Sequence, residues 1–227
     1  MKYKVLILSF AAMLIGTVPA RAGDVLDRIV ATVNNHIILQ SEWQDAIRFE
    51  AFENARPLNE LQAGDQKAAL DHLIDQQLLR EQMRTSGFPH ASNDEVEKRI
   101  QDIRKLHPGA DSEAGWQSVL TRYGLTEKEI KRRVALQVDL MGLVDARLRP
   151  NVVIDSKSIE SYYNRELLPQ LQQSGSPAVP LAAVTPKIKE LLTQQKMNEM
   201  LVAWLHDLRS GSDIRTETFS DSGGELR

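Results

Sequence analysis

The stretch from Arg28 to Trp43, RIVATVNNHIILQSEW, constrains the fold most strongly, because two short β-branched runs flank a two-residue turn. The runs are Ile29–Val33 and Ile37–Ile38, and β-branched side chains favour the pleated surface of a sheet. Asn34 and Asn35 lie between them, and Asn tolerates the positive φ that such turns require. A lone hairpin is only marginally stable in water. The sequence therefore predicts that another strand or a helix covers this hairpin.

Two helices are predicted directly after the hairpin. Ser41 can cap the first, which runs to about Asn54, and Gln44 three residues later completes a capping box. The second, about Gln66–Thr85, carries apolar residues on more than one side, which indicates several packing partners. We expect it to be the central helix of the core, ended by Gly87 in the left-handed conformation.

Three further helix starts follow. Ser92, Asp111 and Thr126 each offer a side-chain oxygen to the free amides at the beginning of a helix. Glutamate stands three residues after Ser92 and Thr126, so both form capping boxes. These signals predict helices over about residues 93–106, 112–123 and 127–148.

The last part of the chain is predicted to return to the hairpin. Asp155 or Ser156 caps a helix, and residues 169–185 form a linker rich in Pro, Gln, Ser and Gly. Thr185 before Pro186 is typical of a helix start, and that helix is expected to run to about Arg209. Residues 214–219 then alternate as a strand does, which supplies the third strand.

The expected fold class is mainly α, with a small antiparallel sheet made from the N-terminal hairpin and the C-terminal strand. Residues 1–22 begin with lysines, continue as an apolar run and end in Ala20-Arg21-Ala22, which is typical of a cleavable secretory signal peptide. We expect one domain over residues 23–219, with an N-terminal part, 27–168, and a returning part, 186–219. Residues 220–227 are expected to be a disordered tail.

The amino-acid composition excludes some classes of site and partner. The chain has no cysteine, so its stability must come from packing, and thiol nucleophiles and cysteine-based metal sites are excluded. Loss of the leader lowers the basic residues from 28 to 25 against 31 acidic residues. This negative balance argues against nucleic acid as a partner. No stretch after the leader is long and apolar enough to span a membrane.

No catalytic motif is present in the sequence. The histidines show no metal-ligand spacing, and no glycine-rich phosphate loop or serine-nucleophile motif occurs. We expect no catalytic residue, metal or cofactor. His36 in the turn and His72 on its helix are expected to be exposed; the remaining histidines are His90, His107 and His206.

Two groups of residues leave alternatives open. A basic cluster at the start of a helix either contacts an anion or forms a solvated face, and the second interpretation is favoured because acids alternate with it; its members are Lys128, Lys131, Arg132 and Arg133. The tryptophans either contact a client or pack in the core, and core packing is favoured; they are Trp43, Trp116 and Trp204.

Amphipathic helices around one hairpin can leave apolar grooves that bind extended or amphipathic peptides. Flexible methionine side chains would let such a groove adapt, although core packing is favoured for each of them; they are Met83, Met141, Met197 and Met200. The sequence assigns no individual groove residue.

Four stretches, in this order and spacing, resemble the SurA-type periplasmic chaperones, which share a peptide-binding fold with trigger factor. They are IVATVNNHIILQSE, ALDHLIDQQLLREQMRTSGF, SNDEVEKRIQDI with YGLTEKEIKRRVALQVDLMGLVDARLRP, and PLAAVTPKIKELLTQQKMNEMLVAWLHDLRSGSDIR. Together they cover most of residues 27–217. In that family, parvulin-type prolyl isomerase domains usually precede the last helix. Here only about 18 residues occupy that place, far fewer than the ~50 of a small domain.

The resemblance implies an ATP-independent periplasmic chaperone without the isomerase domain, whose partners are unfolded outer-membrane or secreted polypeptides. The alternatives are a family member with residual prolyl isomerase activity, or an adaptor for one partner of the outer-membrane assembly machinery. The chain is expected to be a monomer or a dimer that exchanges its C-terminal helix across the linker.

Overall fold

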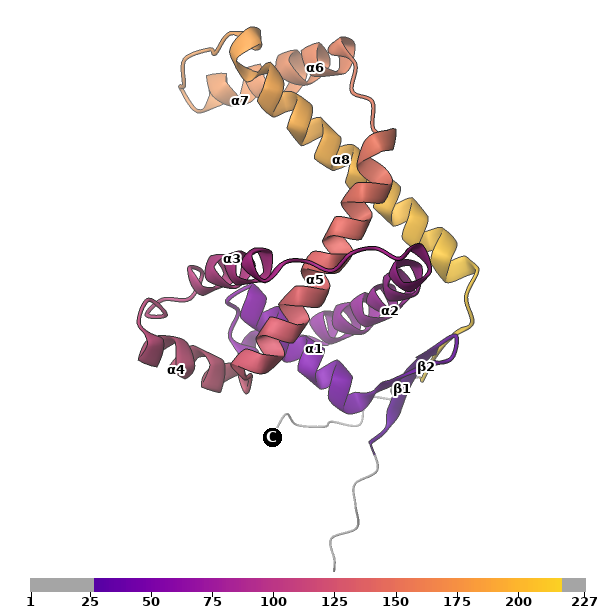
Figure 1. Ribbon diagram of the computed structural model, residues 1–227. Helices are drawn as coiled ribbons and strands as arrows, with labels where there is room; N and C mark the ends of the chain where they lie inside the picture. Colours follow the sequence, from indigo (N-terminus) through magenta and orange to yellow (C-terminus); the bar gives the residue numbers. More distant parts are fainter. Residues whose placement is uncertain (1–26, 218–227) are drawn as a thin grey trace, which may run out of the picture.

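The computed structural model describes residues 27–217 (Figure 1). The predicted signal peptide and C-terminal tail therefore lie outside the described residues. In chain order, the strands and helices are β1 (Ile29–Val33), β2 (His36–Leu39), α1 (Gln40–Glu53), α2 (Ala63–Ser86), α3 (Asn93–Arg104), α4 (Glu113–Tyr123), α5 (Glu127–Leu148), α6 (Ser156–Tyr162), α7 (Leu168–Gln173), α8 (Leu181–Ser210) and β3 (Ile214–Thr216). Short 3₁₀ turns precede α2 and follow α5, and a π-helical turn, Tyr163–Leu167, joins α6 to α7.

The three strands form one antiparallel sheet in the order β2-β1-β3. β1 pairs with β2 through the predicted hairpin and with β3 at its other edge, where Ala31 lies opposite Thr216 and Val33 opposite Ile214. The mainly α fold with a hairpin completed by a C-terminal strand is thus confirmed. The two ends of the described chain meet in this sheet.

Asn34 joins the hairpin turn to two other elements. Its φ is 54°, in the left-handed region that Asn tolerates. The side-chain amide donates to Glu81 of α2 over 2.8 Å, and the side-chain oxygen accepts from the Asp213 amide over 3.0 Å. The Asn34 amide donates to the Asp213 carbonyl over 2.7 Å. One residue therefore fixes the turn against both α2 and the approach to β3.

α2 is the central helix, as predicted. It contacts β1, α1, α5 and α8, and its buried side chains include Ile74 and Leu78. A core cluster packs the sheet residues Val30, Val33 and Ile38 against these two side chains. At the far end of α8, Arg209 donates to Asp75 of α2 over 2.6 Å, which secures the returning helix.

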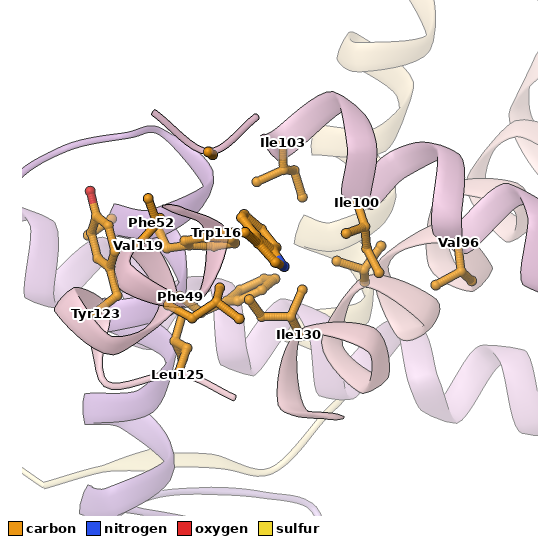
Figure 2. Packing of buried hydrophobic residues seen from close by; sticks show 14 residues of the cluster. Phe49, Phe52, Val96, Ile100, Ile103, Trp116, Val119, Tyr123, Leu125 and Ile130 are labelled. Carbon is orange, nitrogen blue, oxygen red and sulfur yellow. The ribbon is translucent and has the colours of Figure 1, made fainter. Parts of the chain in front are cut away.

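A second core cluster joins α1, α3, α4 and the start of α5 (Figure 2). Phe52 of α1 is fully buried, and its ring lies 5.7 Å from Trp116 of α4 and 5.6 Å from Tyr123, measured between centroids. His107 stacks on the same ring at 4.8 Å and donates from Nε2 to the Phe52 carbonyl. These contacts hold α4 against α1.

The second half of α5 projects away from the sheet and crosses α8 (Figure 1). At its end, α6, the π-helical turn and α7 pack beside the N-terminal part of α8, and we call this group the arm. Tyr163 donates its hydroxyl proton to the Val179 carbonyl over 2.6 Å, which ties the segment before α8 to the arm. No helix within residues 27–217 is long and apolar enough to cross a membrane.

Two predicted helix caps are wrong. α1 begins at Gln40, and the Glu42 carboxylate accepts from the Leu39 amide, whereas the Ser41 hydroxyl is hydrogen-bonded to Asp27. Ser112, not Asp111, caps α4 by accepting from the Gly115 amide. At α1 the residues before β1 accept from the free amides, since the Ser41 amide donates to Asp27 and the Gln40 amide to the Arg28 carbonyl. At α4 the hydroxyl of the next residue in sequence takes the place of Asp111. The caps at Ser92 and Thr126 and the left-handed Gly87 are as predicted.

The predicted start of the last helix is also wrong. α8 begins at Leu181, so Pro186 lies inside the helix and residues 181–185 are helical instead of part of a linker. Proline in this position removes the hydrogen bond that its own amide would have made, and its ring crowds the carbonyl four residues earlier. The Thr185 hydroxyl donates to the Leu181 carbonyl and so supports the first turn. Helical geometry also continues through residue 173, which leaves only residues 174–180 between α7 and α8.

Substitutions of Asn34 test whether this residue fixes the hairpin turn against α2 and the approach to β3. Asn34→Gly keeps the turn conformation but loses the side-chain bonds, so the free energy of unfolding should fall by about 1–2 kcal/mol. Asn34→Ala also places a Cβ at positive φ and should lose roughly 1 kcal/mol more. Chemical denaturation measures both values. Asn35→Ala, beside it in the turn, should change stability by less than about 0.5 kcal/mol; equal stability of all three variants would contradict this role.

Candidate binding cavity

A cavity of about 600 Å³ lies between β2, α1, α2 and α5, and we call it the central cavity. Its volume is within the range of pockets that bind small molecules. The sheet and the aromatic core fix its walls, since β2 and α2 pack in one core cluster and α1 and α5 in the other. The cavity is therefore bounded by rigid elements.

Apolar side chains from all four walls reach the central cavity. They are Ile38 of β2, Ala46 and Phe49 of α1, Leu73 of α2 and Leu136 of α5. Leu73 and Leu136 are half-buried, so part of each side chain is accessible. Amide side chains stand among them, namely Asn54, Gln76, Gln77 and Gln137. This mixture suits a polypeptide, which presents apolar side chains and backbone hydrogen-bonding groups together.

Each acidic side chain of the cavity wall already has a partner. Glu42 accepts from the Leu39 amide over 3.0 Å, and Asp45 is paired with both Arg48 and Arg133. Glu50 lies 3.0 Å from His72 Nδ1. The acids are thus engaged in the structure of the walls.

Glu53 is the most buried of these acids. Gln137 donates to its Oε2 over 3.3 Å, and Arg99 lies 3.6 Å from Oε1. Its side chain is only 13% exposed, and burial raises the pKa of Glu53 above its usual value, against the lowering effect of Gln137 and Arg99. Burial of this carboxylate therefore costs stability at neutral pH.

Three arginines also line the central cavity: Arg80 of α2 and Arg132 and Arg133 of α5. Arg133 lies 3.6 Å from Asp45, and its guanidinium is 5.5 Å from the centroid of the Phe49 ring. Within residues 27–217, neither Arg80 nor Arg132 makes a hydrogen bond or ion pair. Burial, together with the charges of Arg132 and Arg133, lowers the pKa of Arg80.

The structure divides the predicted basic cluster. Arg132 and Arg133 line the cavity, whereas Lys131 pairs with Glu97 of α3 over 2.9 Å and Lys128 is exposed. The favoured interpretation of a solvated face therefore holds for the two lysines and for Arg132, which are exposed, but not for Arg133, whose side chain is 18% exposed. Arg80, which completes the arginine group, carried no signal in the sequence.

The histidines are placed differently from one another. His36 is half-buried at the start of β2 and lines the cavity, so the expectation that it is exposed is wrong. His72 is exposed as predicted, and His107 is buried in the aromatic core, where burial lowers its pKa. No group of three His, Asp or Glu side chains in residues 27–217 is arranged to hold a metal ion.

Core packing is confirmed for Trp116, which is 4% exposed. Trp43 packs beside the sheet cluster and donates from Nε1 to the Gln66 carbonyl, and Trp204 lies under the Arg147 guanidinium at 4.5 Å. Of the methionines, Met197 is buried, whereas Met141 on α5 is 60% exposed.

A comparison with protein-family models matches residues 3–141 to the SurA-like N-terminal domain. The match covers more than half of the chain. The protein belongs to the SurA-like N-terminal domain family. A comparison with characterised proteins finds no match. SurA-like membership indicates a chaperone-type, peptide-binding domain, and all residues of the central cavity fall between positions 36 and 137, inside the SurA-like match.

The pH dependence of stability tests the burial of Glu53. The pKa of Glu53 is raised in the folded protein, so ionisation of its carboxyl lowers the free energy of unfolding. This loss is absent at a pH below the unfolded pKa of 4.5, and it grows with pH until the pH exceeds the folded pKa. Glu53→Gln removes this loss but keeps an oxygen for Gln137. The variant should therefore gain stability relative to wild type as the pH rises from 4 to 7, measured by urea unfolding. A constant difference would show that the carboxyl is not perturbed.

Proposed function

We propose that this protein is an ATP-independent periplasmic chaperone that binds unfolded exported polypeptides, outer-membrane proteins among them, in the central cavity. The observation that carries the proposal is that the cavity lies wholly within the part matched to the SurA-like domain. The periplasmic location rests on the signal-peptide pattern of residues 1–22.

The walls of the cavity support this proposal chemically. Leu73 and Leu136 offer apolar surface, and the amides of Gln76 and Gln137 can exchange hydrogen bonds with an extended backbone. Such contacts depend little on the client sequence. They therefore suit a protein that binds many unfolded chains weakly instead of one partner tightly.

Binding of this kind needs no nucleotide. A protein that binds the unfolded state lowers its free concentration by mass action, which slows aggregation, and release follows when the client folds or is taken up elsewhere. Exposed apolar side chains beyond the cavity, such as Met141 on α5 and Val202 on α8, offer further adaptable contact surface. We propose binding, and not catalysis, as the activity of the protein.

Suppression of aggregation tests the proposal. An outer-membrane barrel protein is diluted from urea, and light scattering is followed with and without residues 23–227 of this protein. Scattering should fall strongly near a stoichiometric ratio, without ATP. Unchanged scattering at large excess would contradict a general chaperone, and a single stable complex with one folded partner would favour an adaptor.

Site-specific crosslinking locates the client. A photo-crosslinking residue at Gln76, which lines the cavity, should capture the unfolded barrel protein. The same residue at Lys67, exposed on the same helix and outside the cavity, should capture several-fold less. Equal capture at both positions would place the client elsewhere on the surface.

A further inference from the structure

The charged side chains of the central cavity that lack a hydrogen-bond or ion-pair partner within residues 27–217 are positive. Its four acids, Glu42, Asp45, Glu50 and Glu53, all have hydrogen-bond or ion-pair partners within the protein. Arg80 and Arg132 have neither within residues 27–217. Arg132 is exposed, whereas Arg80 is half-buried, and a half-buried guanidinium without a partner is unfavourable because it has lost water and gained no acceptor in exchange.

The three arginines of the central cavity repel one another electrostatically. The charges of Arg132 and Arg133 both disfavour the charged form of Arg80, and Glu42 is the acid that opposes them. Glu42 is shared, because its Oε2 also accepts from the Leu39 amide at the start of α1. Arginine nonetheless remains protonated in proteins, so this end of the cavity keeps an excess of positive charge.

We propose that the arginine end of the central cavity binds a carboxylate group of the polypeptide client; this inference rests on the proposed function. A guanidinium presents parallel N–H donors that fit the two oxygens of a carboxylate. Arg80 and Arg132 approach from different helices, α2 and α5, so a carboxylate between them would also close this end of the cavity. Leu136, half-buried one turn after Arg132 on α5, offers an apolar surface for the neighbouring client side chain.

A carboxylate on a polypeptide has two sources, the free C-terminus and the side chain of Asp or Glu. The arginines recognise the same group in either case. Three fluorescent peptides with one common sequence free of Lys and Arg separate the two sources: one ends in a free acid, one is amidated, and one is amidated with a single internal Asp. Fluorescence anisotropy measures their affinity for residues 23–227.

Peptides with a carboxylate should bind about tenfold more tightly than the neutral amide, with the advantage shrinking as salt is added. Arg80→Gln combined with Arg132→Gln should remove this advantage and leave the affinity of the neutral amide unchanged. Arg80→Lys keeps the positive charge but lacks the planar guanidinium, so this variant should retain part of the affinity advantage of the carboxylate peptides. The better-bound carboxylate peptide identifies the source.

Arg84→Gln is the matched control. Arg84 lies one turn after Arg80 on α2, is exposed and does not line the cavity, so the advantage should persist in this variant. Thermal unfolding followed by circular dichroism confirms that the variants are folded; if the double variant is unfolded, Arg132→Gln alone provides the test, because Arg132 is exposed.

The outcomes separate the inference from the proposed function. Equal binding of all three peptides, or an advantage that survives in the arginine variants, would overturn the carboxylate site and leave the peptide-binding function standing. A failure of every peptide, the neutral amide included, to bind would overturn both.

Discussion

Strand β1 is the element on which the rest of the structure depends, because both of its edges must be paired. β2 occupies one edge through a two-residue turn, and β3 occupies the other after nearly the whole chain has intervened. A hairpin alone is only marginally stable in water. α8 therefore has to return from the arm to the sheet, and Asn34 and Arg209 secure that return against α2.

This closure also shapes the central cavity. The sheet and α2 form one core cluster, while α1, α3, α4 and the start of α5 form the other. The cavity lies where β2, α1, α2 and α5 meet, and its polar groups therefore stand on elements that are fixed by two separate cores. A site fixed in this way can hold unsatisfied groups such as Arg80, because packing elsewhere maintains the fold.

The sequence predicted those features that depend on neighbouring residues. Ser92 and Thr126 cap their helices because a glutamate three residues later completes each box, and Asn34 takes the expected positive φ. Prediction failed at the last helix: Thr185-Pro186 is typical of a helix start, yet α8 begins at Leu181, directly after Pro180. The cavity could not be predicted, because Arg80 and Arg132 come from helices far apart in sequence. In sequence Arg132 stands among alternating acids and bases, which is the pattern of a solvated face.

The central claim is that the cavity between β2, α1, α2 and α5 binds the client. Methyl NMR tests this claim most directly. Ile and Leu methyl groups are labelled in residues 23–227, and an unfolded outer-membrane polypeptide is added. The account predicts the largest shifts at Ile38, Leu73 and Leu136, which line the cavity, and little change at Ile188, which is buried outside it. Shifts confined to the exposed Leu191 of α8 would contradict it.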